Sequence, residues 1–276
     1  MKGIRGVTCL GELLFIGLGL HDQKYLSLAG LEEAKKANAV FLETYTSLMP
    51  KLSMQELESL IGKHISIVSR QDLEQEEGRV ILNEASKGKA ALLVPGDPLI
   101  ATTHVDLRIR AERQGIKTHV IHGASIISAA IGLSGLQNYK FGKSVTVPWS
   151  EGGHISEAPY RAILENRMMG LHTLCFLDIR AEEKRYMTVR ECLEELLNVE
   201  KTKRSHTITL DTLAVGIARA GSFDPTVKAG YVKELLDYEF GGPPHTLIFP
   251  ARLHFMEAEA LITLAKAPEE IMEKVE

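Results

Sequence analysis

The residues best suited to chemistry lie at 95–104, directly after an apolar run at 90–94 that reads as a buried strand. Two prolines, a glycine and Asp97 end this strand abruptly. In open α/β sheets, ligands bind just outside the carboxyl ends of the strands. Asp97 and the hydrogen-bonding side chains of Thr102, Thr103 and His104 therefore predict a binding site here. Capping of a turn or of the helix that follows is the alternative interpretation for all four side chains.

A second candidate loop, Gly17-Leu18-Gly19-Leu20, follows a short apolar strand at 13–16. Glycines in such a turn let backbone approach a ligand, as in dinucleotide-binding proteins, and Glu43 at the end of the next strand would suit a ribose. However, the third glycine of that fingerprint is missing, and the next helix begins only near residue 28. A nicotinamide-dependent oxidoreductase and a plain tight turn both remain alternatives.

Other chemistry-bearing residues do not form a recognisable catalytic or metal motif. His122, Ser125 and Ser128 suggest nucleophilic catalysis, but no Gly-X-Ser-X-Gly elbow is present, so a hydrolase is not favoured. The histidines lack metal-ligand spacing, and we expect no bound metal. Three widely spaced cysteines give neither a disulfide framework nor a zinc cluster. We expect Cys175 and Cys192 to be inert core residues of a protein in a reducing compartment.

The composition is that of an ordinary globular protein, with 45% hydrophobic and 25% charged residues and a net charge of -4. This charge predicts no attraction to nucleic acid or to an anionic membrane. The basic cluster of Lys201, Lys203 and Arg204 is interpreted as a solvated loop. Neither a membrane-spanning run nor a signal peptide is found, so we expect a cytoplasmic protein with no membrane partner.

Hydrophobic periodicity and turn residues predict two consecutive α/β domains. In the first, strands at 13–16, 39–43, 65–68, 90–94 and 118–121 alternate with helices at 28–37, 54–61, 77–86 and 107–114. This alternation is typical of a parallel sheet covered on both faces. Ser27 is the expected N-cap of the first helix, and Gly62 the expected end of the second.

The second series consists of helices expected at 125–132, 160–169, 189–197, 229–236 and 256–265, and strands at 144–147, 171–179, 213–218 and 246–249. The predicted organisation is an N-terminal extension at 1–12, a first α/β domain at 13–122 and a second at 123–276. No internal repeat is evident.

Taken together, nine ordered segments carry a resemblance to a known family. They lie at 15–20, 43–47, 95–104, 107–111, 139–144, 170–179, 218–222, 229–232 and 243–245. From about Leu13 almost to the C-terminus, the chain resembles the diphthine synthases, members of the tetrapyrrole-methylase-like class of S-adenosylmethionine-dependent methyltransferases. Porphyrin methylases of this class have a glycine-richer first loop and a longer glycine pattern after Gly-Asp-Pro. This chain lacks both, which argues against a tetrapyrrole substrate.

The resemblance implies two α/β domains of the tetrapyrrole methylase type (a class III methyltransferase), with S-adenosylmethionine in the cleft between them, and a homodimer. The substrate it implies is translation elongation factor 2, at a histidine carrying a 3-amino-3-carboxypropyl group. Its amino group would be methylated repeatedly to a trimethylammonium product in diphthamide biosynthesis. The cofactor contacts that carry over are Leu20, Asp97, Ile100, Ser125, Ile126, Leu177, Ala218 and His245.

Methyl transfer from a sulfonium needs mainly alignment of the reacting atoms, and the amine must be neutral to attack. The sequence identifies no compelling base; His104 and His122 are candidates, with capping or packing as their alternative roles. Glu43 and Tyr45 could stabilise the cationic head group, although Glu43 could instead cap a turn. A non-catalytic nucleotide-binding partner of the translation machinery remains a further alternative.

Overall fold

The computed structural model describes residues 11–152 and 155–275. Its contacts divide the chain into two compact units, one up to Ser125 and one from Ile126 onward. The domain boundary expected after residue 122 falls just before this division.

The sheet of the first unit is built from five parallel strands in the order β3-β2-β4-β1-β5. The strands are β1 Gly11–Gly17, β2 Ala39–Glu43, β3 Ile65–Val68, β4 Lys89–Val94 and β5 Ile116–Ile121. The three interior strands, β2, β4 and β1, are apolar and buried over most of their length, as expected for strands covered on both faces. The predicted parallel sheet is thereby confirmed.

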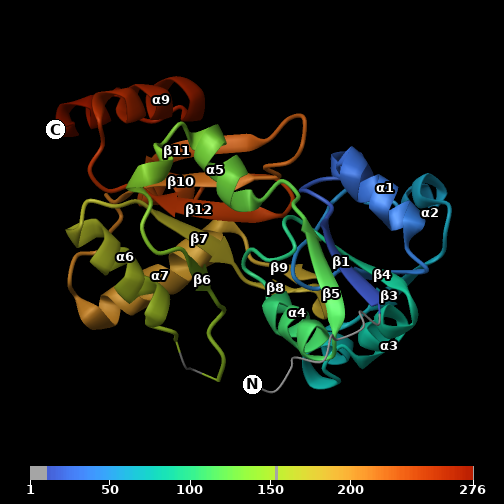
Figure 1. The fold of residues 1–276 in the computed structure, drawn as a ribbon. Helices are drawn as coiled ribbons and strands as arrows, with labels where there is room; N and C mark the ends of the chain where they lie inside the picture. Colours follow the sequence, from blue (N-terminus) through green and yellow to red (C-terminus); the bar gives the residue numbers. More distant parts are fainter. Residues whose placement is uncertain (1–10, 153–154, 276) are drawn as a thin grey trace, which may run out of the picture. The chain divides into compact units, whose positions relative to one another are not determined.

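Helices cover both faces of this sheet (Figure 1). They are α1 Leu28–Lys36, α2 Met54–Ile61, α3 Arg79–Lys87 and α4 His104–Arg113, with short helical turns η1 Gln23–Tyr25 and η2 Gln71–Gln75. Ser27 caps α1 by accepting a hydrogen bond from the Gly30 N–H, as expected. Gly62 ends α2 in the left-handed conformation, at φ 75°, which a glycine adopts without steric cost.

The second unit has a mixed five-stranded sheet in the order β11-β10-β12-β7-β6, in which β6 and β7 are parallel and the other neighbours antiparallel. Its strands are β6 Val145–Val147, β7 Thr173–Leu177, β10 Leu213–Ala218, β11 Thr226–Tyr231 and β12 His245–Phe249. A separate hairpin pairs β8 Ile179–Arg180 with β9 Arg185–Tyr186.

Alternate residues of these strands face two separate hydrophobic clusters. Val215 and Ile217 pack with α5 Ile126–Ser134 and α9 Phe255–Ala265, whereas Ala214 and Ala218 pack with α6 Ala158–Met168 and α7 Val189–Lys203. Figure 1 shows α5 and α9 on one side of this sheet and α6 and α7 on the other. The remaining helical segments are η3 Asn138–Lys140, η4 Ala181–Glu183, α8 Val232–Leu235 and η5 Glu269–Lys274.

Four sequence-based expectations about these elements were wrong. The helix expected at 229–236 is in fact the end of β11 followed by the single turn of α8, because residues 226–231 pair with β10. The strand expected at 171–179 divides into β7 and β8. Strand β1 begins at Gly11, inside the expected extension, whose first ten residues lie outside the described part of the chain. The 201–204 cluster lies at the end of α7, not in a loop.

Candidate active site

Three loops meet where the neighbouring strands β4, β1 and β5 end, at the carboxyl edge of the first sheet. The Gly19 N–H donates to the Gly96 carbonyl at 3.2 Å, and the Gly96 N–H donates back to Gly19 at 2.7 Å. A Cβ atom on Gly17 would lie 2.4 Å from the backbone nitrogen of Gly123. The glycines of both candidate motifs therefore allow the backbones of three loops to touch one another.

Asp97 lies at this junction, with a side chain that is 6% exposed. Its Oδ1 accepts from the Leu99 N–H at 3.1 Å, which forms the turn expected of an aspartate. Its Oδ2 lies 2.7 Å from Nδ1 of His122, whose ring is largely exposed. Asp97 therefore stabilises its own loop and links it to the loop after β5, but it does not cap α4.

The backbone beside Asp97 borders open space, and partly exposed apolar side chains lie near it in the sequence. A Cβ atom added to Gly96 would meet nothing within 4 Å. Ile100, three residues beyond Asp97, is 41% exposed, and Leu20 is half-buried. A buried carboxylate and backbone amides beside apolar side chains can bind the sugar and base of a nucleoside.

The expected cofactor residues of the second unit gather at one edge of its sheet. Ala218, the last residue of β10, is paired with His245, the first residue of β12. Leu177 ends β7, one residue beyond the Phe176–Thr246 pair. Ser125 and Ile126, both half-buried, lie at the division between the units, where α5 begins. That these residues contact a cofactor, and that a cleft between the units holds it, stay predictions.

Both ring nitrogens of His245 are hydrogen-bonded within the protein. Its Nδ1 accepts from the N–H of Val189, the first residue of α7, at 3.2 Å. Its Nε2 lies 3.0 Å from the Gly241 carbonyl, so this nitrogen carries the proton. Burial lowers the pKa of His245, which favours the same neutral form. The ring thus fixes the strand edge against the start of α7.

Glu43 stabilises a turn, one of the three roles expected of it, beside binding a ribose and stabilising a cationic head group. The carboxylate is fully buried and accepts hydrogen bonds from the backbone N–H groups of Tyr45 and Thr46 at 3.0 and 3.1 Å, and from the Thr46 hydroxyl. Burial raises the pKa of Glu43. The fully buried carboxylate of Glu43 therefore serves the turn and is not accessible to the ribose of a dinucleotide.

The two candidate bases differ in their surroundings. His122 is exposed and paired with Asp97. His104 is 2% exposed, begins α4, and its Nδ1 lies 3.0 Å from the Pro98 carbonyl. Its Nε2 has no hydrogen-bond partner in the described part of the chain. Of its two alternative structural roles, His104 has the packing role, because its ring is buried and one ring nitrogen closes the loop after Asp97, whereas no described side chain caps the start of α4.

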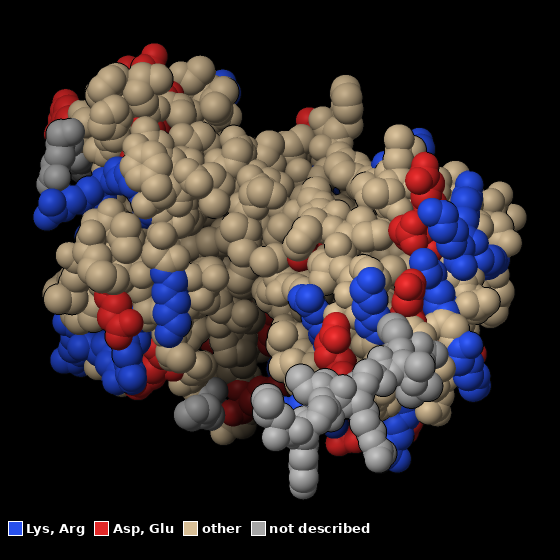
Figure 2. Space-filling view, viewed as in Figure 1, with Lys and Arg blue, Asp and Glu red and all other residues tan. Residues whose placement is uncertain are grey.

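The surface charges, the cysteines and the lengths of the helices bear on three further expectations from the sequence. On the visible face of the first unit, basic and acidic side chains are intermixed, without a field of one sign (Figure 2). Cys175 and Cys192 are fully buried, and burial raises the pKa of both thiols, which confirms them as core residues. Within residues 11–152 and 155–275, no helix is long and apolar enough to cross a membrane.

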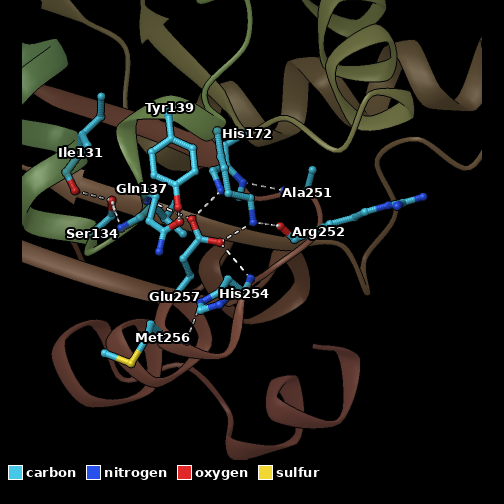
Figure 3. Close-up of polar contacts among 12 residues, drawn as sticks. Ile131, Ser134, Gln137, Tyr139, His172, Ala251, Arg252, His254, Met256 and Glu257 are labelled. Carbon is cyan, nitrogen blue, oxygen red and sulfur yellow. Dashed lines mark hydrogen bonds and ion pairs between the residues drawn. The ribbon is translucent and has the colours of Figure 1, made fainter. Parts of the chain in front are cut away.

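Sequence reasoning missed a buried polar cluster in the second unit, centred on Glu257 of α9 (Figure 3). Its carboxylate is bound by Lys140 Nζ at 2.6 Å, His172 Nε2 at 3.0 Å and the N–H groups of Gln137 and His254, both at 2.9 Å. Burial alone would raise the pKa of Glu257, but these donors outweigh it and lower the pKa to about 2. One signal was available, since Glu257 lies on the buried face of an amphipathic helix.

Comparison with known proteins identifies the class to which this chain and its fold belong. The sequence model of the tetrapyrrole (corrin/porphyrin) methylases matches residues 12–236. The chain belongs to this family, and it is a methyltransferase.

Within the family, its relatives are diphthine synthases. The diphthine synthase of Methanosarcina acetivorans is 50% identical over 269 residues, covering 96% of this chain and 100% of the relative. That of Methanothermobacter thermautotrophicus is 44% identical, covering 95% and 99%. A crystal structure of diphthine synthase superposes with a TM-score of 0.86 at 43% identity, covering 95% and 99%. The resemblance is thereby confirmed, and neither an oxidoreductase nor a porphyrin-type enzyme is supported.

Proposed function

We propose that this protein is a diphthine synthase that transfers methyl groups from S-adenosylmethionine to elongation factor 2. The acceptor is the amino group of the 3-amino-3-carboxypropyl-histidine, which is methylated repeatedly to the trimethylammonium form. The observation that carries the proposal is the match to diphthine synthases over nearly the whole of both chains. The protein would act in the cytoplasm, as a homodimer.

The strand-edge geometry supports the choice of cofactor. S-adenosylmethionine supplies a methyl group on a positively charged sulfur. Asp97 is buried but borders the open space at Gly96, where a carboxylate can accept hydrogen bonds from a ribose. The apolar side chains of Leu20, Ile100, Ile126 and Leu177 would contact the adenosine. Because both ring nitrogens of His245 already have hydrogen-bond partners, we expect this residue to contact the cofactor through its main chain.

The chain itself needs to supply orientation more than covalent chemistry. Holding the amine in line with the activated methyl group turns a bimolecular reaction into an effectively unimolecular one. The rigid junction of the loops after β1, β4 and β5 suits this task, because their backbones are in mutual contact.

Mass spectrometry of the precursor-bearing elongation factor tests the proposal. After incubation with the enzyme and S-adenosylmethionine, we expect successive mass increases of one, two and three methyl groups on the modified histidine. An unmodified factor would contradict the proposal. Thermal-shift measurements supply the cofactor control, because a ligand that binds the native state raises its melting temperature. S-adenosylhomocysteine should raise it, and NAD should not.

A further inference from the structure

Two buried polar atoms at the carboxyl edge of the first sheet make no hydrogen bond of standard geometry in the described chain, although the Thr103 side chain lies close enough to one of them, the Tyr45 hydroxyl, to lower its pKa. They are Oη of Tyr45, just after β2, and Nε2 of His104, the first residue of α4, which follows β4. The two strands are neighbours, and the residues are only 6% and 2% exposed. Their rings meet edge to face at 6.4 Å. A buried polar atom without a partner destabilises the folded state, so a pair of them calls for a functional explanation.

The hydrogen-bonding character of both atoms is defined by their surroundings. The Pro98 carbonyl can only accept, so Nδ1 of His104 carries a proton, and in the neutral ring Nε2 then presents a lone pair. Burial raises the pKa of Tyr45 to about 12, and the carboxylates of Glu43 and Glu74 act in the same direction. The Tyr45 hydroxyl therefore keeps its proton and can donate it. The pair offers one acceptor and one donor.

Charges are arranged on the two sides of this pair. The exposed Arg70 lies over the Tyr45 ring, with its guanidinium carbon 5.3 Å from the ring centroid. Arg70 has no ion pair with any other described residue. On the inner side, the buried Glu43 interacts electrostatically with His104. The Arg70 guanidinium is thus exposed to solvent, whereas the His104 ring and the Glu43 carboxyl group are buried.

We propose that Arg70, Tyr45 and His104 form the subsite for the zwitterionic amino-acid end of the substrate side chain. The carboxylate is bound by the Arg70 guanidinium and the Tyr45 hydroxyl, and the ammonium donates to Nε2 of His104. This inference rests on the proposed function, since it names where that substrate's reacting group is held. The Pro98 carbonyl that orients His104 directly follows Asp97, which places the subsite beside the candidate cofactor loop.

The subsite has a consequence for repeated methylation. Unmethylated, monomethylated and dimethylated ammonium groups each retain at least one N–H to donate to His104. A trimethylammonium group has none, so this hydrogen bond is lost at the third transfer. A charge-assisted hydrogen bond of this kind corresponds to about tenfold or more in affinity. The wild-type protein should therefore bind the dimethylated factor about tenfold more tightly than the trimethylated one.

Binding of elongation factor 2 in its precursor, dimethylated and trimethylated forms, measured with saturating S-adenosylhomocysteine, tests the subsite. In His104→Asn, the amide nitrogen can still donate to Pro98, but no acceptor remains at the Nε2 position. We expect about tenfold weaker binding of the precursor and no discrimination between the dimethylated and trimethylated forms. His104→Gln restores an acceptor near the Nε2 position and should recover part of both.

Two further variants keep the test valid if His104 variants fail to fold. Tyr45→Phe and Arg70→Ala should each weaken precursor binding severalfold, whereas Arg79→Ala, which removes another exposed guanidinium, should not. Affinity for S-adenosylhomocysteine should be unchanged in all of them, which reports an intact fold. Wild-type affinity for the precursor in His104→Asn, Tyr45→Phe and Arg70→Ala would overturn the inference. A crystal structure with the precursor in which only a water molecule contacts Tyr45 and His104 would overturn it as well. Failure of wild-type methyl transfer would instead overturn the proposed function.

Discussion

At the scale of single residues, the loop after β4 depends on one side chain. Asp97 accepts from Leu99 and pairs with His122, so its carboxylate is held in one orientation beside open space. A carboxylate fixed in this way can bind a ligand without first losing side-chain freedom. The same residue therefore serves the loop and, as proposed, the cofactor.

Asp97→Ala should weaken binding of S-adenosylhomocysteine by about tenfold or more, because a hydrogen bond to a charged group is lost. Isothermal titration calorimetry measures this, and circular dichroism should show that the fold survives. Asp106→Ala, which removes an exposed carboxylate from α4, is the matched control and should bind normally. Unchanged affinity in Asp97→Ala would remove this residue from the site.

At the scale of elements, the meeting of three strand ends requires glycine. A Cβ atom on Gly123 would lie 2.3 Å from the Gly96 carbonyl oxygen and 2.8 Å from the carbonyl carbon of Gly17. Both obstacles are backbone, so they cannot rotate away as a side chain would. The junction of the loops therefore has no room for any larger residue.

Gly123→Ala should destabilise the protein by about 1–3 kcal/mol and weaken S-adenosylhomocysteine binding, because the loop of Asp97 must move. Thermal unfolding and calorimetric titration measure the two effects. Gly132→Ala is the control: a Cβ atom there meets nothing within 4 Å, and the position is helical. That variant should be neutral or stabilised by about 0.5–1 kcal/mol. Equal stability of the two variants would contradict the packing argument.

The start of α7 is fixed by a capping box. The Thr188 hydroxyl accepts from the Glu191 N–H at 3.2 Å, and the Glu191 carboxylate accepts from the Thr188 N–H at 2.8 Å. Thr188→Ala should lower the free energy of unfolding by about 1 kcal/mol, whereas Thr188→Ser should retain most of it. Urea unfolding followed by fluorescence of Trp149, the single tryptophan, reports on this unit. Equal loss in both variants would show that the hydroxyl is not responsible.

At the scale of the whole molecule, the Glu257 cluster makes stability depend on pH. The pKa of about 2 lies below the ordinary value of 4.5, so its contribution is complete above pH 4.5 and is lost as pH falls toward 2. This shift corresponds to about 3 kcal/mol. Burial also lowers the pKa of His172, which again reduces stability as pH falls, here from its ordinary value of 6.5 downward.

Glu257→Gln should therefore be less stable than the wild type by about 3 kcal/mol at pH 7, and this difference should shrink between pH 4.5 and 2.5. Urea unfolding followed by Trp149 fluorescence measures the difference. Glu259→Gln, an exposed neighbour on the same helix, is the control and should track the wild type at every pH. A pH-independent difference would show that the carboxylate charge does not stabilise the cluster.

The sequence by itself determined the features that depend on neighbouring residues. The strand Ala39–Glu43 and the helix Met54–Ile61 are found where they were expected, because apolar periodicity, caps and turn residues act over a few positions. The family could likewise be recognised from the sequence, because its motifs are runs of adjacent residues. The loop of Asp97 was recognised because prolines and glycine mark the end of a strand.

Only the tertiary structure decided which distant residues meet. Residues 229–231 are a strand and not a helix because β10 lies beside them, and local propensity cannot register that partner. Likewise, His122 pairs with Asp97 across 25 positions, and Glu257 with Lys140 across 117. Such contacts form because packing brings their elements together and buried polar groups then require partners, a condition that no local pattern of residues encodes.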